Sequence, residues 1–412
     1  MSLQEMGNKI QKCVKGKYCD VVSAFFTFDM PEYPTYSKQE SIRLFAMAGI
    51  RNSYVETEAM NMRLRGYICQ TGETAMDRIY HRSSAEVLHE GIQANDHIIQ
   101  VAVERGELKP DLVVALDTHN VYRYTKLSFR EERKRMCSDI RTVIGTQPKD
   151  GACYAHEYMT LQNIKMKDES TYVLAFDRFL PLQSRTATAR DLILETESKT
   201  GSKVMLIVAD GGFDGVDDMR MFKEIRKHFV VRADKDKKVK AMVEDCEENE
   251  RSYHVEFEYV KGGKKRTVVV NLVSINVEWL KKQGIKYPLV KKGFLTFFTD
   301  LYPNENESLE QFVLHIALFY KKRWGIEVGY RDIGDFEAKT HSLHDAARLF
   351  LYIQAILLYN LWIQINLEFK DDPDRKKYFR DGIPKSVIKS IMEQTALDEV
   401  STSRKRKGFL KH

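Results

Sequence analysis

The stretch KVMLIVAD, residues 203–210, decides how the middle of this chain folds. It is a short, nearly continuous apolar run that ends in an acid, which is typical of a strand buried inside a sheet. Helical patterns lie on both sides of it, TARDLILETESKT (188–200) before and VDDMRMFKEIRKH (216–228) after, and FVVRAD follows as a further strand. Strands and helices that alternate in this way predict a sheet covered by helices.

The strands predicted before this region do not alternate with helices. The run DLVVALD (111–117) also ends in an acid, VYRYTKLSF (121–129) is placed to pair with it, and TYVLAFD closes a strand region that covers 152–177. Antiparallel strands followed by strand and helix in alternation predict a mixed sheet.

The alternation stops between residues 236 and 292. RSYHVEFEYV and KRTVVVNLV flank KGGKK (261–265), which predicts a β-hairpin with glycine at the turn. LTFFTDL (295–301) then resumes the core as a strand, and residues 308–311 form a capping box that starts the next helix. We therefore expect an inserted β subdomain.

The first 109 residues have helical patterns, with capping boxes at 53–56 and 83–86. TGETAMDRIYHRS (71–83) predicts a short basic helix after a glycine turn, of a size and charge suited to a helix-turn-helix reader of DNA. Its basic side chains are Arg78, His81 and Arg82. A small helical bundle with a solvated basic face is the equally weighted alternative.

The whole chain has an ordinary composition, with 412 residues, 43% hydrophobic and 30% charged. This length allows two or three domains. The six Cys are scattered without a Cys-x-x-Cys pair and the N-terminus lacks a signal pattern, so we expect reduced thiols in the cytoplasm. The apolar run 349–365 is interrupted by Gln354, Asn360 and Gln364 before the roughly 20 residues that a membrane span needs. It predicts a buried helix and no membrane association.

The net charge is +6, and its distribution says more than its sum. Residues 401–412 contain five basic side chains and no acid. Such a tail suits a polyanion such as nucleic acid. A solvated, disordered end is the alternative interpretation.

Three acids stand out by position. Asp117 and Asp210 end two buried strands, and Glu327 lies on the polar face of a late helix. Carboxylates from strand ends and a facing helix are the oxygen ligands that a pair of Mg²⁺ ions requires. Two such ions about 3.5–4 Å apart activate the attacking oxygen and stabilise the leaving oxygen in phosphoryl transfer.

The polar face of that helix contains more than the acid. In ALFYKKRWGIEVGYRD (317–332), a rotation of about 100° per residue places five side chains on one side. They are Tyr320, Arg323, Trp324, Glu327 and Arg331. Burying a carboxylate or a guanidinium is costly unless it is paired or coordinated, so this face requires a partner.

These residues resemble the insertion-sequence transposases of the DDE class, in the group whose last acid lies in a Tyr-x-x-Arg-x-x-x-Glu signature. Asp117 in VVALDTHN is similar to the family's first acid and Asp210 in LIVADGGFDG to its second. YKKRWGIE is similar to the signature, with Glu327 as the third acid. The strand LTFFTDL before it and THSLHDAARLFLYIQAILLYNLW after it also look like the family, so the resemblance covers about 110–367.

The resemblance implies an α/β fold, in which a ribonuclease-H-like core of mixed sheet contains an inserted β subdomain between its fifth strand and the helix of Glu327. The domains expected are a helical DNA-binding region at 1–109, the first part of the core at 110–235, the β subdomain at 236–292, the second part of the core with the Glu327 helix at 293–370, and a basic C-terminal tail at 371–412.

The implied activity is that of a transposase, which binds the ends of its own element, cleaves there with metal-activated water and joins the freed 3′-hydroxyls to target DNA. Asp117, Asp210 and Glu327 are the implied catalytic residues and ligands of two Mg²⁺ ions, for which Mn²⁺ can substitute. The implied DNA contacts are Tyr320, Arg323 and Arg331 at the phosphates beside the cut and Trp324 on a displaced base; a core position is the alternative for Trp324.

Transposition joins two ends in one complex, so the resemblance implies a homodimer on double-stranded DNA, in the cytoplasm and associated with the nucleoid. Two rival functions stay open. One is a metal-dependent nuclease of the same fold that performs no strand transfer, and the other is a domesticated DNA-binding protein without catalysis.

One signature position departs from the family. A Lys usually lies seven residues after the Glu, and here that residue is Gly334. Arg331, one turn earlier, and Lys339 are the candidates that can supply the charge.

Two further residues lie close to the expected acids. Asp214 competes with Asp210 for the second position, but the apolar run stops at Asp210. His119 either approaches the metals or is a hydrogen-bonding neighbour of Asp117. GGFDG lacks the spacing of a nucleotide-binding fingerprint, so we expect no nucleotide site.

Overall fold

The computed structural model describes residues 2–394, with gaps. The residues outside the description are 15–16, 33, 68, 124–143, 150–151, 165–170, 181–182, 234–236, 245–250, 261–266, 286, 288–292, 343, 380–381, 392 and everything after 394. The expected KGGKK turn and the basic segment 401–412 therefore lie outside the described residues.

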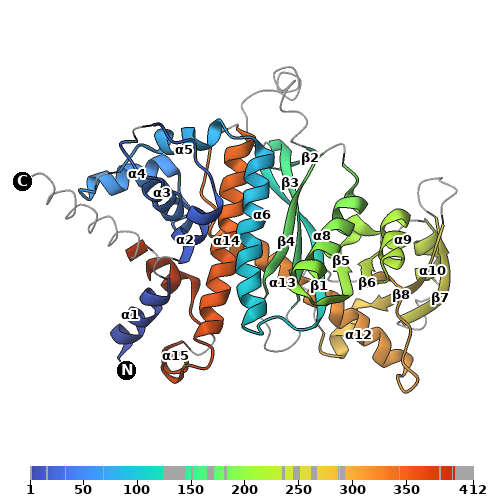
Figure 1. The fold of residues 1–412 in the computed structure, drawn as a ribbon. Coiled ribbons are helices and arrows are strands. Elements are labelled where there is room, and N and C mark those ends of the chain that lie inside the picture. Colours follow the sequence, from blue (N-terminus) through green and yellow to red (C-terminus); the bar gives the residue numbers. More distant parts are fainter. Residues whose placement is uncertain are drawn as a thin grey trace, which may run out of the picture.

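A mixed sheet of nine strands forms the centre of the molecule (Figure 1). Its order is β2-β3-β1-β5-β6-β9-β8-β7, and β4 pairs with β3 off this path. The strands are β1 (Asp111–Arg123), β2 (Ile144–Lys149), β3 (Ala152–Asn163), β4 (Val173–Phe179), β5 (Lys203–Ala209), β6 (His228–Arg232), β7 (Arg251–Tyr259), β8 (Val268–Asn276) and β9 (Phe294–Thr299). Strands β1, β5 and β6 are parallel to one another, whereas the described pairs at both sides are antiparallel. The predicted mixed sheet is confirmed.

The first strand is longer than expected. Residues 111–117 and the beginning of 121–129 were predicted as two strands, but β1 runs without interruption from Asp111 to Arg123. Its partner along this length is β3, with Val114 opposite Asn163 and Arg123 opposite Tyr154. The twelve-residue β3 pairs with β1 from Val114 to Arg123 and keeps these residues in one strand, so the prediction of two paired strands is wrong here.

The expected insertion follows β6 and contributes β7, β8 and the short helix α11 (Val277–Lys282). Strands β7 and β8 pair antiparallel, which confirms the hairpin. Backbone pairing between β8 and β9 makes the insertion a continuation of the core sheet.

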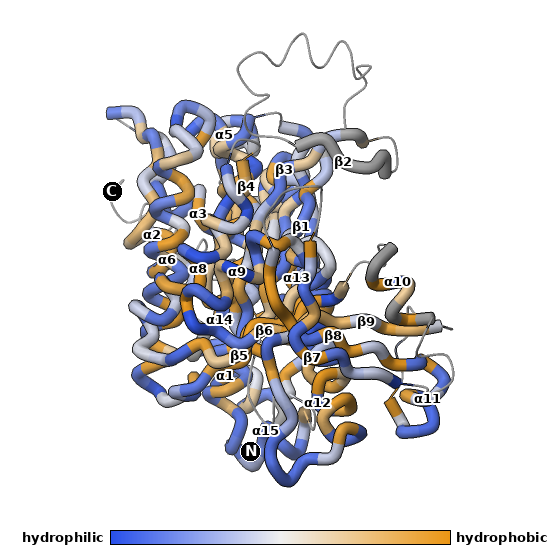
Figure 2. The backbone as a smooth tube through the Cα atoms, turned by 90° about the vertical axis from the view of Figure 1, so that its right-hand side faces the viewer, coloured by the Kyte–Doolittle hydropathy of each residue, from blue (hydrophilic) through white to orange (hydrophobic). Residues whose placement is uncertain are grey.

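Helices cover both faces of the sheet. One hydrophobic core cluster joins the sheet to α8 (Arg185–Thr200) and α9 (Val216–Glu224). The cluster on the opposite face joins it to α12 (Leu309–Lys322), α13 (Trp324–Gly334) and α14 (Asp345–Glu368). This half also contains α10 (Lys237–Glu244) and α15 (Pro373–Tyr378). Figure 2 shows the apolar residues concentrated along the strands in the middle of the sheet.

The N-terminal region is helical, as expected. It contains α1 (Leu3–Val14), α2 (Lys17–Phe25), α3 (Lys38–Ile50), α4 (Val55–Leu64), α5 (Gly72–Tyr80) and α6 (Ser84–Glu104). These helices share the second core cluster with α12–α14, and α6 runs beside α14 between the other N-terminal helices and the sheet (Figure 1). No separate core divides the N-terminal helices from α14 within the described residues.

Two of the three basic residues predicted in the segment 71–83, Arg78 and Arg82, stabilise the fold. Arg78 is 5% exposed and donates hydrogen bonds to the Ser41 hydroxyl and the Tyr36 carbonyl. Arg82 pairs with Glu90, with Nη2 and Oε1 2.9 Å apart. Both guanidinium groups are engaged inside the helical region, which favours the bundle over the helix-turn-helix reader.

Two of the three predicted capping boxes are present, at Ser83 and Ser308. The prediction at 53–56 is wrong, because Tyr54 is the N-cap of α4 and its side chain makes no capping bond. The Ser53 hydroxyl instead donates to Glu58 across 2.7 Å.

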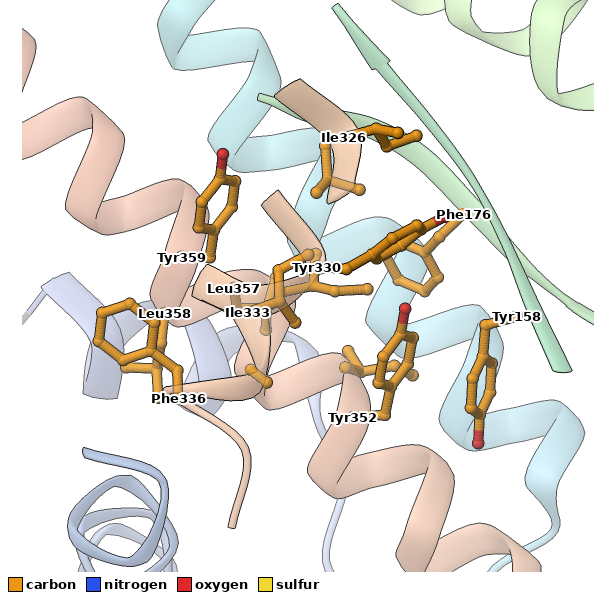
Figure 3. Packing of buried hydrophobic residues seen from close by; sticks show 14 of the residues in the cluster. Tyr158, Phe176, Ile326, Tyr330, Ile333, Phe336, Tyr352, Leu357, Leu358 and Tyr359 are labelled. Carbon is orange, nitrogen blue, oxygen red and sulfur yellow. The ribbon is translucent and has the colours of Figure 1, made fainter. Parts of the chain in front are cut away.

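Helix α14 confirms the buried helix expected at 349–365. It is long and apolar enough to cross a membrane, but 94% of its most apolar window is buried inside the protein. Its polar residues bind neighbouring elements: Asn360 donates to Asn95 of α6 and to the Val173 carbonyl of β4. Figure 3 shows Tyr352, Leu357 and Leu358 of this helix within the core, near Ile333 and Phe336.

Candidate active site

The register of the parallel strands brings two acids together. Leu116 of β1 pairs with Ala209 of β5, so the next residues, Asp117 and Asp210, lie beside each other. Both belong to the side of the sheet that α12 and α13 cover, because side chains alternate along a strand. Asp117 lies inside β1 and not at its end as expected, and it is 8% exposed. Asp210 follows β5 directly and accepts the Gly212 N–H at 2.8 Å.

The register between β5 and β6 places a basic side chain beside the two acids. Ala209 pairs with Val231 of β6, so Arg232 lies beside Asp210. Arg232 is exposed and lines a pocket of about 630 Å³ together with Asp210, Tyr320 and Arg323. Arg232 was not predicted as a site residue, although it directly follows the apolar residues of the strand FVVRAD, much as the two acids follow theirs.

Arg323 connects the sheet to the third acid. Its Nη1 donates to Asp117 Oδ2 at 2.9 Å and its Nη2 to Glu327 Oε1 at 2.6 Å. The Arg323 residue is 6% exposed. Through these ion pairs, Asp117 supplies the partner that the buried Arg323 on the polar helix face requires.

The segment 317–332 is not one continuous helix, as the sequence projection assumed. Helix α12 ends at Lys322 and α13 begins at Trp324. At the junction the Arg323 N–H bonds to the Tyr320 carbonyl and the Ile326 N–H to the Arg323 carbonyl. These bonds span three residues, which tightens the turn relative to an α-helix and makes Arg323 the cap of both helices.

Charge is concentrated around Asp117. Burial, together with the charge of Asp210, raises the pKa of the Asp117 carboxyl to about 7, although Arg323 opposes the rise. Burial acts to lower the pKa of Arg323, but the neighbouring Tyr320 and the carboxylates of Asp117 and Glu327 raise it overall. Three carboxylates thus lie near the two guanidinium groups of Arg323 and Arg232, and this excess of negative charge favours a bound cation.

The remaining signature residues differ in exposure. Tyr320 is 2% exposed, its ring lies 4.8 Å from that of Phe297, and Arg323 lies over it at 5.2 Å. Trp324 is half-buried at the start of α13. The Arg331 side chain is 72% exposed, and its recorded ion pair is with Asp332 at 3.9 Å. The described contacts therefore bring Tyr320 and Arg323 to the carboxylates but not Arg331.

A tyrosine fastens α13 to the sheet beside Asp117. The Tyr330 hydroxyl lies 2.7 Å from the hydroxyl of Thr160, which is the register partner of Asp117 on β3. His119 stacks on the Tyr330 ring with centroids 4.7 Å apart. Tyr330 lies close to Ile326 and Ile333 of its own helix in Figure 3. His119 is thus packed against aromatic rings, and Tyr330 fixes the helix that carries Glu327.

The alternative second acid lies apart from the pocket. Asp214 is 2% exposed and its N–H bonds to the Gly211 carbonyl. Asp210 lines the pocket next to Asp117 and Asp214 does not. The geometry favours Asp210 as the site acid.

The donors fit a hard divalent cation, since all three are carboxylates. Within the described residues, however, no group of three or more His, Cys, Asp or Glu side chains is close enough to hold a metal ion as it stands. The Arg323 guanidinium lies between Asp117 and Glu327 and pairs with both, so it links the two carboxylates while keeping them apart.

Comparison with known proteins identifies the type of site. The family model described as "Transposase DDE domain" matches residues 141–361, more than half of the chain, and this range includes Asp210 and Glu327 and starts after Asp117. No curated protein sequence matches the chain.

Among solved structures, the fold is similar to a piggyBac transposase synaptic complex with hairpin DNA, with a TM-score of 0.54 and 10% sequence identity. The similarity covers 96% of this chain and 79% of that chain. At this identity it concerns the fold, which is the ribonuclease-H-like fold expected from the sequence. Transposases of the DDE class generally use divalent metal ions. The chain belongs to the transposase DDE domain family.

Proposed function

We propose that this protein is an active transposase that binds the ends of its own element, cleaves the DNA there and joins the freed 3′-hydroxyls to target DNA. The observation that carries the proposal is the register of β1 and β5, which puts Asp117 next to Asp210, together with the Arg323 bridge from Asp117 to Glu327. Two acids of the sheet and one of a facing helix thus lie around Arg323 at one corner of a ribonuclease-H-like fold.

Asp117, Asp210 and Glu327 would hold two Mg²⁺ ions, or Mn²⁺ in their place. When bound, such ions activate the attacking oxygen and stabilise the leaving oxygen. The raised pKa of Asp117 supports this assignment, because the buried acid next to Asp210 lacks enough positive charge. Tyr330 keeps Glu327 near these acids through its bond to Thr160.

The cations of the pocket would hold the DNA strand. Arg232 is exposed at the end of β6, and no ion pair among the described residues engages it as the carboxylates engage Arg323, so it is suited to a phosphate beside the cut. Arg323 and Tyr320 would approach the next phosphate. Trp324 would stack on a displaced base, and the exposed Arg331 would contact the backbone farther along the duplex.

The proposed partner is double-stranded DNA, both element ends and target. A homodimer would hold the two ends in one complex, and the basic segment 371–412 would add contacts to the DNA backbone. We place the enzyme in the cytoplasm, associated with the nucleoid.

The test is a strand-transfer assay with the inverted repeats that flank the gene. Cleaved ends that become joined to target DNA in Mg²⁺ would support the proposal. Cleavage without joining would identify a nuclease of the same fold, and binding without cleavage would identify a DNA-binding protein. Asp210→Asn should abolish both steps, whereas Asp111→Asn, at the exposed start of β1, is the matched control and should leave them unchanged.

A further inference from the structure

Arg323 engages the oxygens that a metal ion would need. Its Nη1 donates to Asp117 Oδ2 at 2.9 Å and its Nη2 to Glu327 Oε1 at 2.6 Å. The other oxygen of the first acid, Asp117 Oδ1, accepts the Thr118 N–H at 2.8 Å. Both oxygens of Asp117 are therefore engaged, and one guanidinium joins two carboxylates that a divalent cation would otherwise bind.

The guanidinium and two divalent ions compete for the same corner. Like charges repel strongly at a separation of about 4 Å where water is largely excluded, and Arg323 is only 6% exposed. The three carboxylates already lie near the guanidinium groups of Arg323 and Arg232. Two divalent ions would add more positive charge than these carboxylates leave to be neutralised. Tight binding of both ions thus requires further negative charge, which the phosphates of DNA carry.

The pocket beside the acids offers Arg323 a second position. Its volume is about 630 Å³, and its lining includes Arg232, Asp210, Tyr320 and Arg323 itself. The guanidinium lies over the Tyr320 ring, 5.2 Å from the centroid. Because Arg323 is part of this lining, a side-chain rotation suffices to turn its guanidinium from the carboxylates to a phosphate bound in the pocket. Arginine forms bidentate pairs with phosphate as it does with carboxylate.

Glu327 has room to move once its partner leaves. Its side chain is 41% exposed, whereas that of Arg323 is 8% exposed, and it lies in the first turn of α13. Tyr330, about one turn later, holds the helix against the sheet through the hydroxyl of Thr160. The Glu327 carboxylate can therefore turn towards Asp117 while α13 stays in place.

We propose that Arg323 closes the metal site of the free protein and opens it when a DNA phosphate takes over its guanidinium. The protein then binds its metal ions tightly only with DNA in the pocket, so the carboxylates are assembled for cleavage only on bound DNA. This inference rests on the proposed function, since it requires metal ions at the carboxylates and DNA beside them.

The first experiment measures the affinity of the full-length protein for Mn²⁺ alone, without DNA, by electron paramagnetic resonance of the free ion. Arg323→Met removes the charge at nearly constant length and should bind Mn²⁺ about tenfold more tightly than the wild-type protein. Arg323→Lys keeps the charge but lacks the planar fork that joins two carboxylates, so its affinity should lie between these two values.

Two further variants show where the gain arises. Arg220→Met removes the same charge from an exposed position of α9, at the opposite face of the sheet, and should leave the Mn²⁺ affinity unchanged. Asp117→Asn, added to Arg323→Met, should return the affinity to the wild-type value or below it, because the first acid is then lost as a ligand. Circular dichroism checks that each variant is folded.

The second experiment uses the wild-type protein and needs no folded variant. Two duplex probes have the sequence of the inverted repeats that flank the gene, but in one of them uncharged methylphosphonates replace the phosphates nearest the cleaved 3′ end. Both probes end in a dideoxynucleotide, so they cannot be joined to another strand. The charged probe should raise the Mn²⁺ affinity about tenfold and the neutral probe should raise it little. In Arg323→Met the charged probe should also add little.

Equal Mn²⁺ affinity of the wild-type protein and both Arg323 variants without DNA would overturn the proposal. So would an equal rise with the charged and the neutral probe, or a gain in Arg323→Met that survives Asp117→Asn. These outcomes concern the role of Arg323 alone. If the wild-type protein bound no Mn²⁺ even with the charged probe, the metal site would be refuted, and the proposed function with it.

Discussion

Two regions of the molecule differ in how far the local sequence predicts their arrangement. One is formed by the carboxyl ends of β1, β5 and β6, and the other by the N-terminal helices. At the strand ends, each functional residue lies within or directly after an apolar run, and the parallel register aligns Asp117, Asp210 and Arg232 in one row. In the N-terminal helices, residues far apart in the chain decide the packing, as in the contact of Phe45 with Phe350 of α14 at 5.0 Å between centroids. Local pattern reveals the first arrangement, and only the folded molecule reveals the second.

The largest expected effect comes from removing the N-terminal helices. A fragment that starts at Pro110 would expose the face of α14 that now packs against α2, α3, α5 and α6. Since this face is apolar and lies inside one continuous core cluster, we expect the fragment to lose its cooperative unfolding transition and to bind hydrophobic dyes. Circular dichroism during heating checks this. A fragment that melts cooperatively near the temperature of the full chain would show that residues 1–109 are an independent domain.

The next effect is on catalysis without loss of fold. Asp117→Asn, Asp210→Asn and Glu327→Gln should each reduce end cleavage in Mg²⁺ by about a thousandfold or more, while affinity for the ends changes little. Single-turnover cleavage and anisotropy measure the two quantities. Asp214→Asn is the informative comparison: if it abolishes cleavage and Asp210→Asn does not, the second acid has been assigned to the wrong residue.

The sequence alone predicts those parts of the fold and the site that depend on local signals. The strand that ends at Asp210 and the helix of Glu327 were predicted because apolar runs and capping boxes are local signals. The break in the helix at Arg323 was not predicted, because it depends on the ion pairs of Arg323. The continuation of β1 through Asp117 was not predicted either, because it depends on pairing with β3. Likewise, Arg78 looked like a DNA contact because its buried partners, Ser41 and Tyr36, are more than 35 residues away in the chain.

A smaller effect is expected where α14 meets α6 and β4. Asn360 donates to Asn95 and bonds both backbone groups of Val173. Asn360→Leu would leave the buried N–H and carbonyl of Val173 without this partner, so we expect a loss of about 2–3 kcal/mol in the free energy of unfolding. Urea denaturation measures it. Asn304→Leu, at an exposed loop position, should stay within about 0.5 kcal/mol of the wild-type protein.

A pH dependence of similar size is expected at the N-terminus of α14. Burial acts to raise the pKa of Asp345, but His156, Arg178 and Ser84 together lower it to about 2 from 3.8. Because the folded-state pKa is the lower one, this carboxylate stabilises the fold above about pH 4, and the contribution, about 2 kcal/mol, is lost as the pH falls towards 2. Asp345→Asn should flatten the stability profile between these values. An unchanged slope would mean that other acids dominate acid unfolding.

The smallest expected effect distinguishes the two candidates for the missing signature lysine. The Arg331 side chain is 72% exposed on α13, and Lys339 is exposed in the segment after this helix, so both can reach DNA. Each alanine variant should lower the affinity for duplex DNA a few-fold and reduce the salt slope by about one, because each removes one phosphate contact. Arg331→Lys should restore the salt slope, because the charge returns even though the planar fork is lost. If Arg331→Ala slows cleavage strongly while Lys339→Ala is silent, the end of α13 must turn towards the carboxylates when DNA binds, and the cation of this site belongs to the helix rather than to the segment that follows it.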